Sequence, residues 1–140
     1  MKSIIGLMIP KKGTNFLEED STLRNALEKF KAHKFSTVPI IGKDGKYIRT
    51  ISEGDLLRYI TDLPNFSMVL AEKISVAAVG SYRSYQALNI DAPIVEIVSL
   101  SLKQNFIPLV DDRGLYIGII KRKEILEFLL ENRDLSLKQD

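Results

Sequence analysis

The sequence predicts a mixed fold of the α+β (α/β) type, built from two tandem βαββα units. The stretch GKYIRTISEGDLL, residues 45–57, recurs 69 residues later as GLYIGIIKRKEIL, residues 114–126. The same offset holds without a gap from Pro39 and Pro108 onward. Each copy places a β-hairpin pattern before a segment whose apolar residues have helical spacing. Two copies of one small unit therefore account for most of the chain.

The composition is that of an ordinary globular protein. Hydrophobic residues make up 45% and charged residues 27% of the 140 positions. A unit of about 60 residues is only marginally stable alone, so we expect the two units to depend on each other. The chain has no cysteine and a single histidine, His33, which excludes disulfides, thiolate metal sites and multi-histidine metal sites. We expect neither a metal nor a catalytic cofactor.

Charge and hydropathy exclude two classes of partner. The net charge is +2 and the basic residues are scattered, apart from Lys121 to Lys123, so we expect no nucleic-acid groove. The apolar run of residues 4–9, which could form a strand or a helical turn, is too short for a signal peptide or a membrane span. We therefore expect a cytoplasmic protein with no membrane partner.

The first copy reads strand, helix, strand, strand, helix. Residues 15–17 form a short strand pattern, and the next helix carries an apolar stripe from Leu23 to Phe30. Residues 37–41 and 46–51 flank a Gly-Lys-Asp-Gly turn, which is typical of a hairpin. Ser52 then stands at the N-cap of a second helix, with Asp55 three residues on, as in a capping box.

The second copy repeats this order after a connector. Residues 80–86, GSYRSYQ, form a polar and aromatic loop, and a short strand pattern follows at 87–89. Asp91 is the expected N-cap of the next helix. The hairpin recurs at 107–111 and 115–120, a closing helix follows, and a polar tail is expected to fray from Arg133. We expect the first repeat, with the N-terminal segment, at residues 1–70 and a linker at 71–86. The second repeat is expected at 87–134 and the tail at 135–140.

These motifs resemble a tandem pair of cystathionine-β-synthase (CBS) domains, also called a Bateman module. The resemblance rests on KFSTVPII and GKYIRTISEGDLL in the first copy, and on QNFIPLVDD and GLYIGIIKRKEIL in the second. More narrowly, the chain is similar to the free-standing two-domain proteins of Firmicutes, whose first copy carries HxxTxxPV and TEGD. The resemblance implies repeats packed with pseudo-two-fold symmetry.

The function implied by the resemblance is regulatory and non-catalytic. Such pairs bind AMP, ADP, ATP, S-adenosylmethionine or cyclic di-AMP in clefts between the repeats, commonly form homodimers and signal to a partner protein. The family motif at the junction of strand and helix matches Ser52 and Asp55, which would hold the ribose and phosphate. By the same correspondence, Thr37, Val38 and Pro39 would form the wall against which the adenine base packs. Phe16 and Leu17 are further candidates for this contact.

The residues at this junction also support ligand binding on physical grounds. A carboxylate can accept hydrogen bonds from both hydroxyls of a ribose, and a helix N-terminus favours a phosphate. The alternative is that Ser52 and Asp55 only cap the helix. We expect ligand contact because the repeat places the pair within the family motif.

The second copy departs from this motif. Lys121 replaces the hydroxyl and Glu124 replaces the aspartate, so a ribose clamp is in doubt there. Lys121, Arg122 and Lys123 at a helix N-terminus could instead bind phosphate, or they could form a solvated basic turn. The sequence thus predicts one nucleoside site and one degenerate or anionic site.

The loop between the copies supplies further candidates. Arg83 suits a phosphate, and Tyr82 and Tyr85 can stack on a purine. The alternative is an ordinary surface loop. Cyclic di-AMP, with two bases and two phosphates, would need such additional contacts.

Two other functions compete with that of a sensor. The first is a ligand-independent dimerisation or interaction scaffold, which the replacements at Lys121 and Glu124 favour. The second is an enzyme, for which no catalytic motif is present in the sequence. We therefore expect a non-catalytic, homodimeric sensor of an adenine nucleotide.

Overall fold

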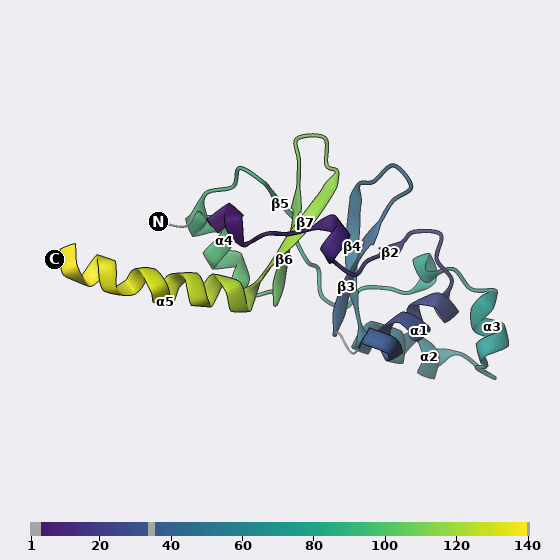
Figure 1. The fold of residues 1–140 in the computed structure, drawn as a ribbon. Helices are drawn as coiled ribbons and strands as arrows, with labels where there is room; N and C mark the ends of the chain where they lie inside the picture. The colour runs from purple at the N-terminus through teal and green to yellow at the C-terminus, as the bar shows by residue number, and fades with distance from the viewer. Residues whose placement is uncertain (1–3, 34–35, 140) are drawn as a thin grey trace. The chain divides into compact units, whose positions relative to one another are not determined.

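The computed structural model describes residues 4–33 and 36–139 (Figure 1). They form two compact units. One contains residues 15–85, and the other contains the described residues up to Thr14 together with those from Gln86 onward. Each unit has a sheet and helices of its own, and this mixed α/β architecture of two βαββα-like repeats confirms the predicted fold class.

The first unit contains a three-stranded sheet in the order β2-β3-β4. Strand β2 runs parallel to β3, and β3 pairs with β4 in an antiparallel hairpin, as the sequence predicts. Its elements in chain order are β2 (Leu17–Glu18), α1 (Leu23–His33), β3 (Thr37–Ile41), β4 (Tyr47–Ser52), α2 (Glu53–Asp62), α3 (Met68–Glu72) and the 3₁₀ turn η3 (Val76–Ala78).

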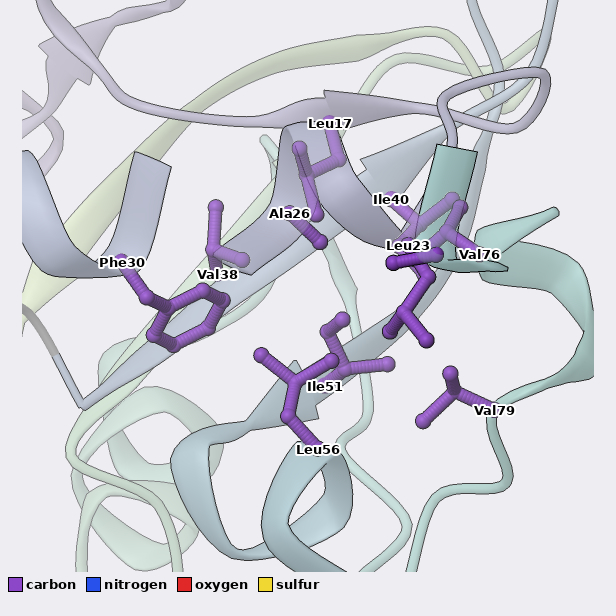
Figure 2. Close-up of a cluster of buried hydrophobic side chains, with 11 residues drawn as sticks. Leu17, Leu23, Ala26, Phe30, Val38, Ile40, Ile51, Leu56, Val76 and Val79 are labelled. Carbon is purple, nitrogen blue, oxygen red and sulfur yellow. The ribbon is translucent and has the colours of Figure 1, made fainter. Parts of the chain in front are cut away.

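The core of this unit lies where α1 and α2 pack on the sheet. Figure 2 shows Phe30 of α1, Leu56 of α2 and the strand residues Val38 and Ile51 pointing toward a common interior. Val38 and Ile51 are fully buried. Burying a side chain of this size stabilises the fold by about 1.5–3 kcal/mol. Because this packing fixes α2 against β4, it also fixes the junction between them.

The second unit contains a four-stranded sheet in the order β1-β7-β6-β5. Strand β5 is parallel to β6, and the hairpin of β6 and β7 is antiparallel, as predicted. The N-terminal residues contribute η1 (Ile4–Leu7), β1 (Ile9–Pro10) and η2 (Lys11–Gly13), and the rest of the chain contributes β5 (Leu88–Asn89), α4 (Ile94–Ser101), β6 (Phe106–Val110), β7 (Tyr116–Lys121) and α5 (Arg122–Gln139).

The two hairpins share the details of their backbones. Gly45 and Gly114 occupy the same place in the two turns, with φ angles of 86° and 84°, a region that strongly favours glycine. Each hairpin has a register shift near its turn, between Ile40 and Ile41 in one and at the equivalent place in the other. The 69-residue repeat in the sequence is therefore a repeat in the structure.

Three local expectations differ from the structure. Helix α4 begins at Ile94 with Pro93 at the N-cap, so the expected cap at Asp91 is wrong. Helix α5 continues to Gln139, beyond the expected start of the tail. Strand β1 pairs with β7, so the N-terminal segment packs with the second repeat and not with the first.

The described residues contain neither a candidate membrane-spanning helix nor a candidate metal-binding cluster. Within those residues, none of the helices combines the length and the hydropathy that crossing a membrane requires. The same part of the chain holds no group of three or more His, Asp or Glu residues that could bind a metal ion.

The contact between β1 and β7 makes a first prediction. A Cβ atom at Gly118 would lie 2.3 Å from the carbonyl oxygen of Ile9 and 3.0 Å from Met8 Cγ. The variant Gly118→Ala must therefore shift β1, and we expect it to lose about 1–3 kcal/mol in the free energy of unfolding, measured by urea denaturation. Gly80→Ala is the control, because a Cβ there meets nothing within 4 Å. Equal stability of the two variants would contradict this pairing.

Candidate functional site

Ser52 and Asp55 form the capping box that the sequence predicts at the start of α2. The Ser52 Oγ accepts a hydrogen bond from the backbone N–H of Asp55 at 3.1 Å, and Asp55 Oδ2 accepts one from the N–H of Ser52 at 2.8 Å. The N–H of Glu53 donates to the carbonyl oxygen of Ser36 at 2.9 Å. The first turn of α2 is thus held to the residue that precedes β3 and to itself.

The Asp55 carboxylate also binds beyond the capping box. Its Oδ1 accepts from Arg58 Nη2 at 2.7 Å and from the backbone N–H of Tyr82 at 2.8 Å. Asp55 is 5% exposed, whereas the side chain of its partner Arg58 is 52% exposed. The acid is therefore buried within an internal hydrogen-bond network, and one of its charged partners is at the surface.

These contacts lower the pKa of Asp55. Burial by itself raises the pKa, but hydrogen bonds from the backbone of Tyr82, from Ser52 and from Arg58 outweigh burial and hold the pKa below its usual range. Asp55 is consequently a carboxylate at neutral pH. In that form it can only accept hydrogen bonds, as a ligand hydroxyl would require.

A cavity of about 290 Å³ adjoins this carboxylate. Its volume is at the lower end of the range that is typical of small-molecule sites. All of the lining residues belong to the first compact unit: Thr37, Thr50, Ile51, Ser52, Gly54, Asp55, Arg58, Tyr82, Arg83 and Tyr85. The cavity therefore combines a carboxylate, hydroxyls, two guanidinium groups and two aromatic rings beside a helix N-terminus.

The linker segment, residues 80–85, forms one wall of the cavity and is attached to β4. Arg49 Nη1 donates to Ser81 Oγ at 2.7 Å, and Ser81 Oγ donates to the carbonyl oxygen of Thr50 at 2.9 Å. The Tyr82 N–H bond to Asp55 is the next contact along the segment. The linker is thus fixed to the same junction as the carboxylate.

The cavity brings together six of the residues that the sequence analysis proposed for ligand binding. Thr37, Ser52, Asp55, Tyr82 and Arg83 all line the cavity, and so does Tyr85 of the same loop. Among the described residues, Arg83 makes no hydrogen bond or ion pair.

Four other proposed residues do not line this cavity. Val38 and Pro39 are buried, and Val38 belongs to the hydrophobic core. Leu17 is also a core residue. The ammonium nitrogen of Lys29 lies over the ring of Phe16, 5.8 Å from the ring centroid. In this structure their observed role is packing, and ligand contact by them stays a prediction.

The junction of β7 and α5 has the same backbone as that of β4 and α2 but different side-chain chemistry. The N–H of Arg122 donates to the carbonyl oxygen of Asn105, as Glu53 does to Ser36 in the first repeat. Arg122 Nε also donates to the carbonyl oxygen of Ser101 at 2.7 Å, which ties α5 to the end of α4. Lys121 and Lys123 are exposed, and Glu124 is half-buried.

Sequence reasoning missed four residues in the lining of the cavity: Arg58, Gly54, Thr50 and Ile51. Arg58 lies three residues after Asp55, so the two can meet on one face of the helix. That spacing is a usable signal, but it is shared by many surface ion pairs. Nothing in the sequence distinguished Gly54 or Thr50.

The capping box predicts a difference between the two junctions. Replacing an N-cap serine with alanine costs about 0.5–2 kcal/mol, so Ser52→Ala should lower the free energy of unfolding by about 1 kcal/mol. Lys121→Ala, at the equivalent exposed position, should change it by less than about 0.5 kcal/mol. Urea denaturation measures both. A loss at Lys121→Ala as large as that at Ser52→Ala would refute this role of Ser52.

The lowered pKa of Asp55 predicts how stability depends on pH. Because the folded-state pKa is below the unfolded value of about 4, the contribution of Asp55 is complete above pH 4 and is lost as pH falls through the folded-state pKa. The stability advantage of the wild type over Asp55→Asn should therefore shrink in acid, as measured by chemical denaturation. Asp62→Asn, an exposed carboxylate at the end of α2, is the control and should follow the wild type. A constant advantage of the wild type over Asp55→Asn at all pH values would contradict the network.

Comparisons with known proteins agree with the repeat. The family described as the CBS domain matches residues 8–62 and 79–131. A CBS domain-containing protein of Dictyostelium discoideum is 29% identical over 119 residues, which cover 80% of this chain and 81% of that protein.

Solved structures of similar fold include two that contain a nucleotide. CbpB in complex with c-di-AMP has a TM-score of 0.80 at 21% identity, with coverage of 96% of this chain and 88% of that chain. CbpB of Listeria monocytogenes in complex with c-di-AMP has a TM-score of 0.76 at 22% identity, with coverage of 93% and 95%. At these identities the likeness shows the fold. Because the family match covers most of the sequence and falls on both repeats, the chain belongs to the CBS domain family as a tandem pair.

Proposed function

We propose that the protein is a non-catalytic sensor that binds an adenine nucleotide in the cavity beside Asp55 and signals to a partner protein. The observation that carries this proposal is the cavity of about 290 Å³ next to the buried carboxylate and the start of α2. An acid that only capped the helix would not require an open space beside it. Here the cap and the space occur together.

The lining residues match the parts of a nucleotide. A ribose hydroxyl can donate to Asp55 or Ser52, and the first turn of α2 favours a phosphate. Tyr82 and Tyr85 present aromatic rings on which a purine can stack. Arg83 adds a cation without a partner among the described residues.

Among the ligands, cyclic di-AMP has the strongest support, with AMP, ADP and ATP as the alternatives. The two CbpB structures described above contain c-di-AMP. Their identity to this chain is 21% and 22%, so the ligand is carried over as a proposal. The paired tyrosines and two arginines of the cavity suit a ligand with more than one base and phosphate.

The linker segment supplies a route for a signal. A ligand that contacts Asp55, Tyr82 and Arg83 at once would add contacts to the linker where the chain leaves the first repeat, and so would favour the fixed form of the linker. A partner that binds only the fixed form would then sense the nucleotide, because a ligand shifts an equilibrium by its differential affinity for two states. We expect the protein to act in the cytoplasm as a homodimer.

A dimerisation scaffold without a ligand is the second candidate. In the second repeat, helices α4 and α5 leave large apolar side chains exposed: Ile94, Val95, Leu102, Leu126, Leu129 and Leu130. Such a surface is typical of a contact between protein chains. It is also compatible with a homodimeric sensor, so it does not decide between the two.

A ligand screen distinguishes these candidates. We expect cyclic di-AMP, AMP, ADP or ATP to raise the melting temperature, because a ligand at about 100 times its dissociation constant stabilises the fold by about 2.7 kcal/mol. S-adenosylmethionine completes the set of adenosine ligands to be tested. Asp55→Ala should abolish the shift, whereas Glu124→Ala should reduce it less.

Two results would change this assignment. Equal losses in Asp55→Ala and Glu124→Ala would show that the second junction matters as much as the first. No shift with any of the five ligands, together with intact dimers in light scattering, would favour the scaffold.

A further inference from the structure

Arg58 lines the cavity and, unlike Arg83, is already bonded to the Asp55 carboxylate. Its guanidinium carbon lies 4.5 Å from the centroid of the Tyr82 ring, and its Nη2 donates to Asp55 Oδ1 at 2.7 Å. Among the described residues this is the only hydrogen bond of the Arg58 side chain. Most of its five N–H donors are therefore still available to a ligand.

The position of Arg58 over the start of α2 favours an anion. The guanidinium lies close to the first turn of α2, because a Cβ atom at Gly54 would be in ordinary van der Waals contact with Arg58 Nη1 at 3.4 Å and with Nη2 at 3.7 Å. A cation near a helix N-terminus is unfavourable, and at present Asp55 offsets it. A bound phosphate would interact favourably with both the guanidinium and the helix.

The hydrogen bonds of Asp55 limit how a ribose can bind. A carboxylate has about four acceptor positions, and Ser52 N–H, Tyr82 N–H and Arg58 occupy three of them. A ribose diol donates two hydrogen bonds, so one existing donor must leave. The two N–H groups belong to backbone that is fixed by the capping box and by the linker. Arg58 is the one donor on a side chain, and that side chain is 52% exposed.

On the basis of the proposed function, we propose that Arg58 recognises the phosphate of the nucleotide and exchanges Asp55 for that phosphate when the ligand binds. The ribose hydroxyls then take the acceptor position that Arg58 vacates. Arg58 can remain over the Tyr82 ring while it does so, because the ring contact does not use its N–H donors. The ligand class is accordingly a phosphorylated adenosine, and adenosine alone binds poorly.

The test compares AMP and cyclic di-AMP with uncharged adenosine by calorimetric titration. We expect the wild type to bind at least one nucleotide about 10-fold or more tightly than adenosine, the effect of a charge-assisted contact. In Arg58→Gln this preference should fall toward one. Adenosine itself should bind Arg58→Gln as tightly as the wild type or more tightly, because no arginine competes for Asp55.

Arg24→Gln is the matched control. Arg24 forms an exposed ion pair with Glu28 on α1, and it does not line the cavity, so the variant should keep the wild-type preference. Arg83→Gln tests the other guanidinium in the lining.

Three results would overturn the inference. If a nucleotide binds and its preference over adenosine is unchanged in Arg58→Gln, the proposed function stands and the role of Arg58 is refuted. The same conclusion follows if only Arg83→Gln loses the preference, or if Arg58→Gln weakens adenosine and nucleotide equally. If the wild type binds none of these three ligands and neither ADP nor ATP, the proposed function itself fails.

Discussion

The hydrogen bonds around the Asp55 carboxylate are the constraint on which the first repeat depends. They join the start of α2 to the linker segment through Ser52 and Tyr82. A buried carboxylate without partners would be far more costly than an exposed one, so the fold must bring donors to this point. Backbone N–H groups meet that need with little loss of conformational entropy, because the capping box and the β4 contacts already fix them. The cavity therefore lies beside a carboxylate whose hydrogen-bond donors are already supplied by the fold.

The second repeat shows that the backbone and the site chemistry are separable. Both hairpins have a glycine with positive φ in the turn and a register shift nearby. Both strand-to-helix junctions use the same contact between a backbone N–H and a carbonyl oxygen. The side chains differ, because Lys121 and Glu124 cannot form the capping box of Ser52 and Asp55. The turn geometry is enough to preserve the fold while the junction changes its chemistry.

Local patterns explain what could be predicted from the sequence. Glycine turns, alternating strands and the capping box depend on residues a few positions apart, and these features agree with the structure. The pairing of β1 with β7 depends on residues more than 100 positions apart, and no local signal points to it. Strand geometry alone separates two of the proposed residues. Successive side chains on a strand face opposite sides, so the side chains of Thr37 and Val38 face opposite sides of β3.

Arg58 illustrates a second limit of sequence reasoning. A basic residue three positions after an acid on a helix predicts a surface ion pair of small value. The proposed role of Arg58 depends on the burial of Asp55 and on the cavity beside that carboxylate. Both of these result from packing by segments that are distant in the sequence. The residue type and spacing were visible, but their surroundings were not.

The relative strengths of these bonds indicate the order in which a ligand would displace them. The Arg58 side chain is 52% exposed, so water can replace Asp55 as its partner, whereas the Asp55 carboxylate is buried. A backbone N–H bonded to a buried carboxylate is worth about 1.5–3 kcal/mol. A hydroxyl that competes for Asp55 therefore displaces Arg58 before it displaces Tyr82. The linker keeps its anchor while the guanidinium moves, so binding can change the charge pattern of the cavity without releasing the segment that leads to the second repeat.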